Sequence, residues 1–180
     1  TAVDALGRIY VAVSSDATNR RFPGTYLGSI LRFNADGTVP GFSPVFSRGL
    51  AQSSALAFSD TDGLLWLAGH DGVRNVLLDV PLSGGQPRAA ALDDALVSTG
   101  AIVGLRSRRE GEGIEGVVVD SVNKRAIRFF HGSGGSVSSA IELPQDSTPI
   151  AAGMAQSGQV VVALRTVTDE IILLRVAAPA

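Results

Sequence analysis

The sequence contains no cysteine and almost no lysine. Without cysteine, the chain has no disulfide, no thiolate zinc site and no cysteine nucleophile. Lys124 is the one lysine among 15 basic residues, which stand against 17 acidic residues and give a formal net charge of −2. Because such a chain has no net positive field to attract phosphates, we expect no nucleic-acid partner.

Long hydrophobic runs and an export leader are also missing. No apolar stretch approaches the roughly 20 residues that a transmembrane helix needs, so we expect no membrane span. The chain begins at Thr1 rather than at methionine, and no basic and then apolar leader follows. We therefore interpret the N-terminus as processed, truncated or incompletely represented.

The sequence is rich in short apolar runs that end in turn residues. It has 21 glycines and 8 prolines, and 45% of its residues are apolar. Residues 60–63, Asp-Thr-Asp-Gly, are a typical turn of this kind, with glycine where a tight hairpin needs a positive φ. No apolar stripe with a 3.6-residue period persists for three turns, so the pattern predicts antiparallel strands rather than helices.

These runs repeat four times along the chain. A glycine followed by apolar residues occurs at 7–13, 63–68, 116–119 and 158–164. A second apolar run follows each of them, at 29–33, 75–80, 125–130 and 170–176. Three copies are preceded by a run of small residues, at 54–58, 101–105 and 150–154. The period of roughly 45 to 50 residues is the size of a four-stranded propeller blade.

The repeat predicts an all-β fold, a β-propeller with about four four-stranded antiparallel blades in one propeller region. We place the blades at 1–49, 50–96, 97–146 and 147–180, with the first and the last incomplete. Because open blade edges favour aggregation, we expect the chain to be part of a larger propeller. The remaining blades would precede Thr1 in the same polypeptide or belong to a partner chain.

Candidate ligand-binding residues gather in the loops that a propeller brings together on one face around its channel. They are Asp16, Arg48, Gln52, His70, Asp71 and Arg74. His70 is the candidate catalytic residue, a general base beside Asp71, because histidine titrates near neutral pH. The alternative that these residues are ordinary solvated loops stays open.

Three further residues have simpler structural interpretations. Asp62 belongs to a hairpin turn rather than a calcium loop, because the 12-residue pattern with its terminal glutamate is absent, and we predict no metal site. We expect Trp66 to pack between blades rather than to stack on a sugar. His131 follows a strand on the opposite face, and we expect it on the surface.

The first 70 residues resemble a known family, the soluble quinoprotein glucose/sorbosone dehydrogenases. Residues 27–37, Leu-Gly-Ser-Ile-Leu-Arg-Phe-Asn-Ala-Asp-Gly, are similar to the family's Leu-Gly-Lys-Ile-Leu-Arg-Ile-Asn-x-Asp-Gly. Residues 65–70, Leu-Trp-Leu-Ala-Gly-His, are similar to Leu-Trp-x-x-Glu-His. The resemblance implies a six-bladed propeller that oxidises sugars with pyrroloquinoline quinone (PQQ) and calcium, in a periplasmic or secreted protein.

The chain departs from the family pattern at the residues that would hold the cofactor. Ala-Gln-Ser at 51–53 replaces the family's Arg-Asn-Pro, and Gly69 replaces its glutamate. The resemblance therefore implies an oxidoreductase-like sugar dehydrogenase propeller with an eroded cofactor motif, and it leaves open whether the chain is an enzyme. The alternative is a non-catalytic propeller that serves protein interaction or assembly.

Overall fold

The computed structural model consists of β-strands arranged in four antiparallel sheets. The residues described are 1–14, 26–48, 52–59, 61–70, 73–92, 96, 100–107, 113–133, 135–155 and 157–176. Among these residues, no helix has the length and apolar character needed to cross a membrane.

Each sheet is built from strands that follow one another in the chain, and we call the sheets blades 1 to 4. Blade 1 contains β1 (Ala2–Val3), β2 (Ile9–Val13), β3 (Ser29–Phe33) and β4 (Val45–Arg48). Blade 2 contains β5 (Gln52–Ser59), β6 (Leu64–His70), β7 (Asn75–Pro81) and β8 (Arg88–Ala89). Blade 3 contains β9 (Ala101–Ser107), β10 (Ile114–Asp120), β11 (Arg125–Gly132) and β12 (Gly135–Glu142). Blade 4 contains β13 (Ser147–Met154), β14 (Val160–Thr166) and β15 (Ile171–Val176).

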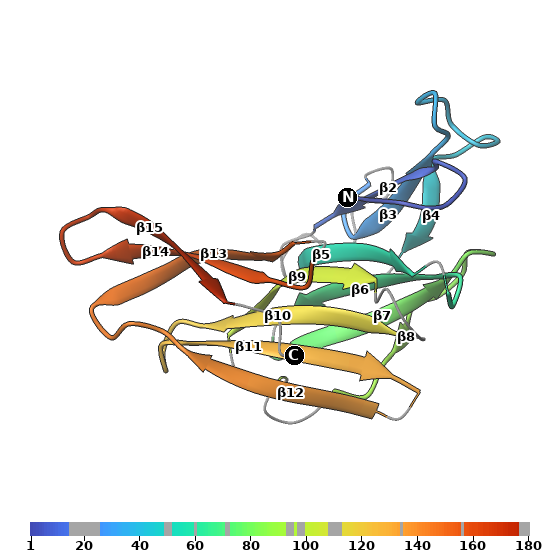
Figure 1. The fold of residues 1–180 in the computed structure, drawn as a ribbon. Coiled ribbons are helices and arrows are strands. Elements are labelled where there is room, and N and C mark those ends of the chain that lie inside the picture. The colour runs from blue at the N-terminus through green and yellow to red at the C-terminus, as the bar shows by residue number, and fades with distance from the viewer. Residues whose placement is uncertain are drawn as a thin grey trace.

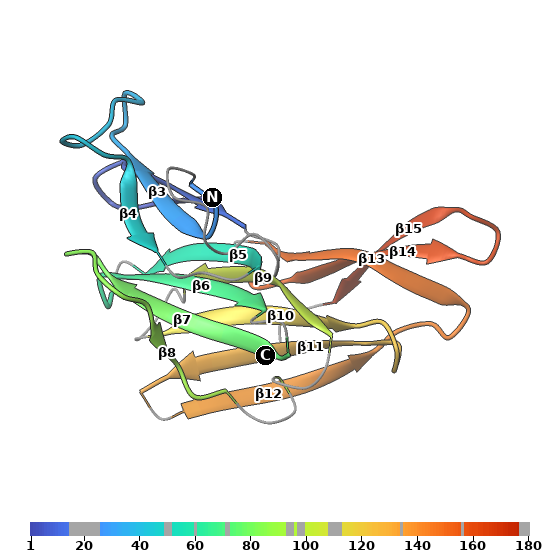
Figure 2. The same ribbon diagram turned by 180° about the vertical axis from the view of Figure 1, so that it is seen from behind.

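The first strands of successive blades contact one another. β1 contacts β5, β5 contacts β9, and β9 contacts β13. β5 and β9 lie side by side in the middle of the molecule, and β12 lies at its outer edge (Figures 1 and 2). Innermost strands that meet in this way, with each sheet running outward, are the arrangement of a β-propeller, so the predicted fold class is confirmed.

Small side chains allow the innermost strands to approach closely. A Cβ atom added at Gly104 in β9 would lie 3.5 Å from the Cα atom of Gly153 in β13 and 3.1 Å from a methyl group of Val117. At Gly104, the absence of a side chain therefore lets β9 lie close to β13.

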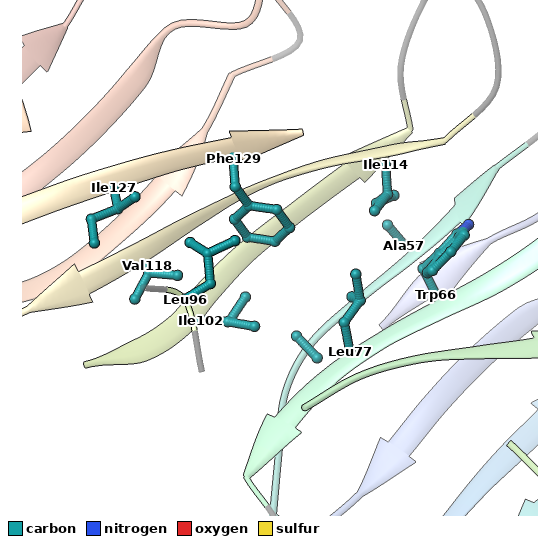
Figure 3. Packing of buried hydrophobic residues seen from close by; sticks show 10 residues of the cluster. Ala57, Trp66, Leu77, Leu96, Ile102, Ile114, Val118, Ile127 and Phe129 are labelled. Carbon is teal, nitrogen blue, oxygen red and sulfur yellow. The ribbon is translucent and has the colours of Figure 1, made fainter. Parts of the chain in front are cut away.

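Three hydrophobic clusters lie between consecutive blades. Tyr10 and Ile30 of blade 1 pack with Leu65 and Leu67 of blade 2. The second cluster joins blades 2 and 3 and contains Ala57, Trp66, Ala68, Leu77, Leu96, Ile102, Ile114, Val118, Ile127 and Phe129 (Figure 3). The third cluster joins blades 3 and 4 and contains Val117, Ala126, Leu143, Val160, Val162 and Leu164.

Blades 2 and 3, which have a neighbour on each side, are consequently buried on both faces. In β6, Leu65 and Leu67 face blade 1, whereas Trp66 and Ala68 face blade 3, because successive side chains of a strand point to opposite sides. This explains why 64–68 is a continuous apolar run. Trp66 is 5% exposed, so its predicted position between blades is confirmed.

Candidate functional site

Several predicted site residues lie at one end of blades 1 and 2. Gln52 begins β5 and pairs with His70, which ends β6, and His70 pairs in turn with Asn75 at the start of β7. Arg48 ends β4 of blade 1. We call this end the polar rim. Gln52, Arg48 and Arg74 are exposed and His70 is half-buried, while Asp16 and Asp71 lie outside the described residues.

The structure thus brings Gln52 and His70 together as cross-strand neighbours but gives Arg74 different surroundings. Arg74 lines a cavity of about 240 Å³ whose other wall is the apolar segment 89–92. This cavity does not include His70.

Asn75 is a structural residue of the rim. It is 3% exposed, and its side-chain amide donates hydrogen bonds to the carbonyl oxygens of Leu96 and Gly100, each at 3.0 Å. These two residues belong to the connection between blades 2 and 3. Asn75 therefore ties that connection to the end of β7.

Gly69 accounts for one departure from the dehydrogenase pattern. A Cβ atom added there would lie 2.3 Å from the carbonyl oxygen of Gln52, which is too close for any side chain. The strands β5 and β6 approach at this point beside an irregularity in their pairing between Ser53 and Ala55. The glutamate of the family pattern therefore does not fit at this position without a backbone shift.

Ser53 stands where the family pattern has a proline, and its hydrogen bonds explain this second departure. Its backbone N–H donates to the Oγ atom of Ser14 at 3.1 Å, and the Ser14 hydroxyl donates to the Ser53 carbonyl oxygen at 3.0 Å. These contacts join β5 of blade 2 to the end of β2 in blade 1. A proline at position 53, as in the family pattern, has no N–H and loses the first of these bonds.

We expect Ser53→Pro to lower the free energy of unfolding by about 3 kcal/mol, because it removes a donor and constrains a strand residue. Ser53→Ala keeps the N–H and is the matched control, with an expected loss below about 1 kcal/mol. Urea denaturation measures both values. Equal losses in the two variants would contradict the role given to the backbone N–H.

A group of titratable side chains surrounds a cavity at the other end of the blades. A cavity of about 450 Å³ lies between blades 2 and 3 and is lined by Thr61, Asp62, Leu64, Trp66, Asp79, Gly113, His131, Gly132 and Ser133. We call it the interblade pocket. Its residues come from the ends of strands and the turns that face away from the polar rim.

His131 lines one wall of this pocket, at the end opposite the polar rim where the sequence predicted it, and it is half-buried rather than fully exposed. The imidazole ring is half-buried and meets the Trp66 indole edge-on, with ring centroids 5.6 Å apart. Its Nδ1 atom is 2.8 Å from the Ser136 hydroxyl. Burial lowers the pKa of His131 below its usual value of 6.5, while the nearby Asp79 carboxylate acts in the opposite direction. The imidazole is therefore neutral at pH 7.

Comparison with known proteins supports the fold. No protein-family model and no curated protein matches the sequence. Among solved structures, a glucose dehydrogenase is 20% identical, with a TM-score of 0.67 over 99% of this chain and 60% of its own. The soluble aldose sugar dehydrogenase of Escherichia coli, in its apo form, is 12% identical, with a TM-score of 0.66 over 96% of this chain and 61% of its own. The fold is that of these sugar dehydrogenases.

The predicted resemblance to sugar dehydrogenases is thus confirmed as a likeness of fold. A second glucose dehydrogenase structure is 16% identical, with a TM-score of 0.68 over 99% of this chain and 63% of its own. The chain therefore spans about three fifths of the length of the sugar dehydrogenases to which it is similar.

The residues described at the polar rim do not fit the PQQ and calcium that the resemblance implies. A quinone with three carboxylates needs several enclosed cations, because an uncompensated buried anion costs several kcal/mol. Arg48 and Arg74 are exposed instead, Gly69 leaves no room for the family's glutamate, and the family's proline at position 53 would lose the hydrogen bond to Ser14. Nor do the described ranges contain a group of three His, Asp or Glu side chains that could hold a metal ion.

Proposed function

We propose that the chain supplies four blades of a sugar-oxidising dehydrogenase propeller, in a periplasmic or secreted protein. The observation that carries this proposal is the likeness of fold to glucose and aldose sugar dehydrogenases over almost the whole chain. Because propellers host many unrelated activities, the likeness supports the substrate class only as a proposal.

Within this proposal, the polar rim binds a small sugar. Gln52 and His70 stand next to each other at the ends of paired strands, and an amide beside an imidazole can both donate to and accept from sugar hydroxyls. The strand pairing holds both backbones in place, which lowers the entropy that binding costs. The described residues assign no step of the chemistry to PQQ.

The test is a dye-linked oxidation assay on aldoses with the full-length protein, run both with and without added PQQ and calcium, because the described residues of the polar rim do not fit these groups. We expect turnover of aldoses. We expect Gln52→Ala to raise the KM for aldose about tenfold and to leave kcat unchanged, because the contact that it removes would stabilise the bound substrate and the transition state equally. Arg88→Ala, at the opposite end of blade 2, is the control and leaves KM unchanged. No turnover of aldoses in either form of the assay would overturn the proposal.

A non-catalytic propeller for protein interaction or assembly is the second candidate. It is favoured by β15, which pairs only with β14 among the described strands and exposes Ile171 by 63% and Leu173 by 64%. Under this proposal a partner chain or further blades cover that face. Light scattering on the same preparation distinguishes the two candidate functions. An assembly protein would show no turnover, and its mass in solution would exceed that of one chain.

A further inference from the structure

The interblade pocket is independent of the polar rim and has the size of a small-molecule site. Its volume of about 450 Å³ lies within the range of about 300–1,000 Å³ that ligand pockets occupy. It combines two carboxylates, an imidazole, two hydroxyls and an indole, which is a dense set of polar groups for one cavity.

The walls of this pocket are held in place by contacts between the two blades. The Oδ2 atom of Asp62 in blade 2 accepts a hydrogen bond from the backbone N–H of Gly113 in blade 3 at 3.1 Å. Gly113 has φ +114°, and a Cβ atom there would lie 2.2 Å from the carbonyl oxygen of His131. Only glycine fits at this position of the wall, where the two blades meet.

The charges in the pocket do not balance. Asp79 is paired with Arg88, with a separation of 2.7 Å between Oδ1 and Nε. His131 contributes no charge at pH 7, because burial lowers its pKa. The described residues offer no ion pair to Asp62, and its Oδ1 atom is buried without a hydrogen-bond partner among them. None of the described residues therefore compensates the Asp62 carboxylate in this wall.

The indole of Trp66 adds an unused donor to the same wall. Its Nε1 atom is buried and has no acceptor among the described residues. Figure 3 shows this nitrogen at the end of the side chain that is remote from Phe129 and Ile127, so the indole nitrogen lies away from the apolar cluster. A buried donor without a partner destabilises the folded chain, and a ligand with an acceptor atom can satisfy it.

We propose that the interblade pocket binds a small organic ammonium compound that also carries a hydrogen-bond acceptor. The ammonium group lies against the Asp62 carboxylate, and the acceptor serves the Trp66 end of the pocket. A metal ion is a poor alternative, since Asp62, Asp79 and His131 do not come together as a set of three ligands in the described structure. The Trp66 indole in the same wall is an aromatic ring of the kind that attracts cations.

The test uses 2-phenoxyethylamine, an ammonium compound with an ether oxygen, and its neutral analogue 2-phenoxyethanol. Trp66 is the only tryptophan of the chain, so its fluorescence on excitation at 295 nm reports on this pocket directly. We expect saturable quenching by the amine at millimolar concentration or below, and at least about tenfold weaker binding of the alcohol, because a hydrogen bond to a charged group is lost.

Asp62→Asn removes the charge while keeping the shape and is expected to weaken amine binding at least about tenfold. Asp146→Asn makes the same change in charge at an exposed position in the turn between β12 and β13, and is expected to leave binding unchanged. Thermal melting confirms that both variants are folded. Any of three results would overturn the proposal. These are equal affinities for the amine and the alcohol, an affinity for the amine that Asp62→Asn leaves unchanged, and no quenching at 10 mM, which is about the upper limit for a specific site.

Discussion

Replacing Glu115 by glutamine is expected to lower the free energy of unfolding by about 3–5 kcal/mol, the cost of removing one partner from a buried ion pair. Glu115 is 9% exposed and lies between two guanidinium groups. Arg106 donates to its Oε2 atom at 2.8 Å through Nε, and Arg128 lies 3.3 Å from its Oε1 atom. Glutamine keeps the volume but removes the charge that compensates both cations.

This cluster also joins blades 3 and 4, which enlarges the expected effect. Arg106 reaches the carbonyl oxygen of Ala155 at 3.4 Å, and a Cβ atom at Gly158 would lie 2.7 Å from its Nη2 atom. Moving the guanidinium groups away after the substitution would therefore disturb the β13–β14 turn.

Glu142→Gln is the matched control for Glu115→Gln, because Glu142 is exposed on β12. Its expected loss is within about 0.5 kcal/mol. Guanidinium or urea denaturation gives both values. A loss below about 1 kcal/mol for Glu115→Gln would show that water compensates the two arginines and would contradict the buried cluster.

Removing the ring of Phe129 is the second large expected effect. Phe129→Ala is expected to cost about 3–5 kcal/mol, because the side chain is 1% exposed in the cluster between blades 2 and 3. Its cross-strand partner is Gly116, and a Cβ atom there would lie 2.3 Å from the Phe129 ring. The ring therefore packs directly over the backbone of β10.

This packing predicts coupling between positions 116 and 129. Gly116→Ala is expected to cost about 1–3 kcal/mol through overpacking. In a Phe129→Leu background the same substitution is expected to cost less, by about 1 kcal/mol, since the smaller side chain leaves room. A double-mutant cycle measured by denaturation tests this, and additive losses would contradict the direct contact.

The fold could be predicted from the sequence because its strands are short apolar runs at a regular spacing. The third strands of the blades, β3, β7, β11 and β15, begin at Ser29, Asn75, Arg125 and Ile171, close to the second apolar run of each repeat. The fourth strands could not be located in the same way. β8 has only two residues, and β12 alternates small polar residues such as Ser136 and Ser138, so neither has an apolar signature.

The sites were less predictable, because they depend on contacts between blades. Gln52 and His70 lie on strands that follow one another in the chain and pair with each other. The sequence was therefore enough to predict that polar residues meet at this end of blade 2. The interblade pocket joins Asp62 to Gly113 and Trp66 to His131, which are far apart in the chain. No local spacing in the sequence signals such a meeting.

The three clusters between the blades have a consequence for how this sequence can change over time. Each face of a blade is in contact with one neighbour only, as Leu65 is with blade 1 and Trp66 with blade 3. A substitution on one face therefore requires a compensating change in a single adjacent blade, while the opposite face remains as it was. Changes can therefore be matched face by face, within one pair of neighbouring blades at a time.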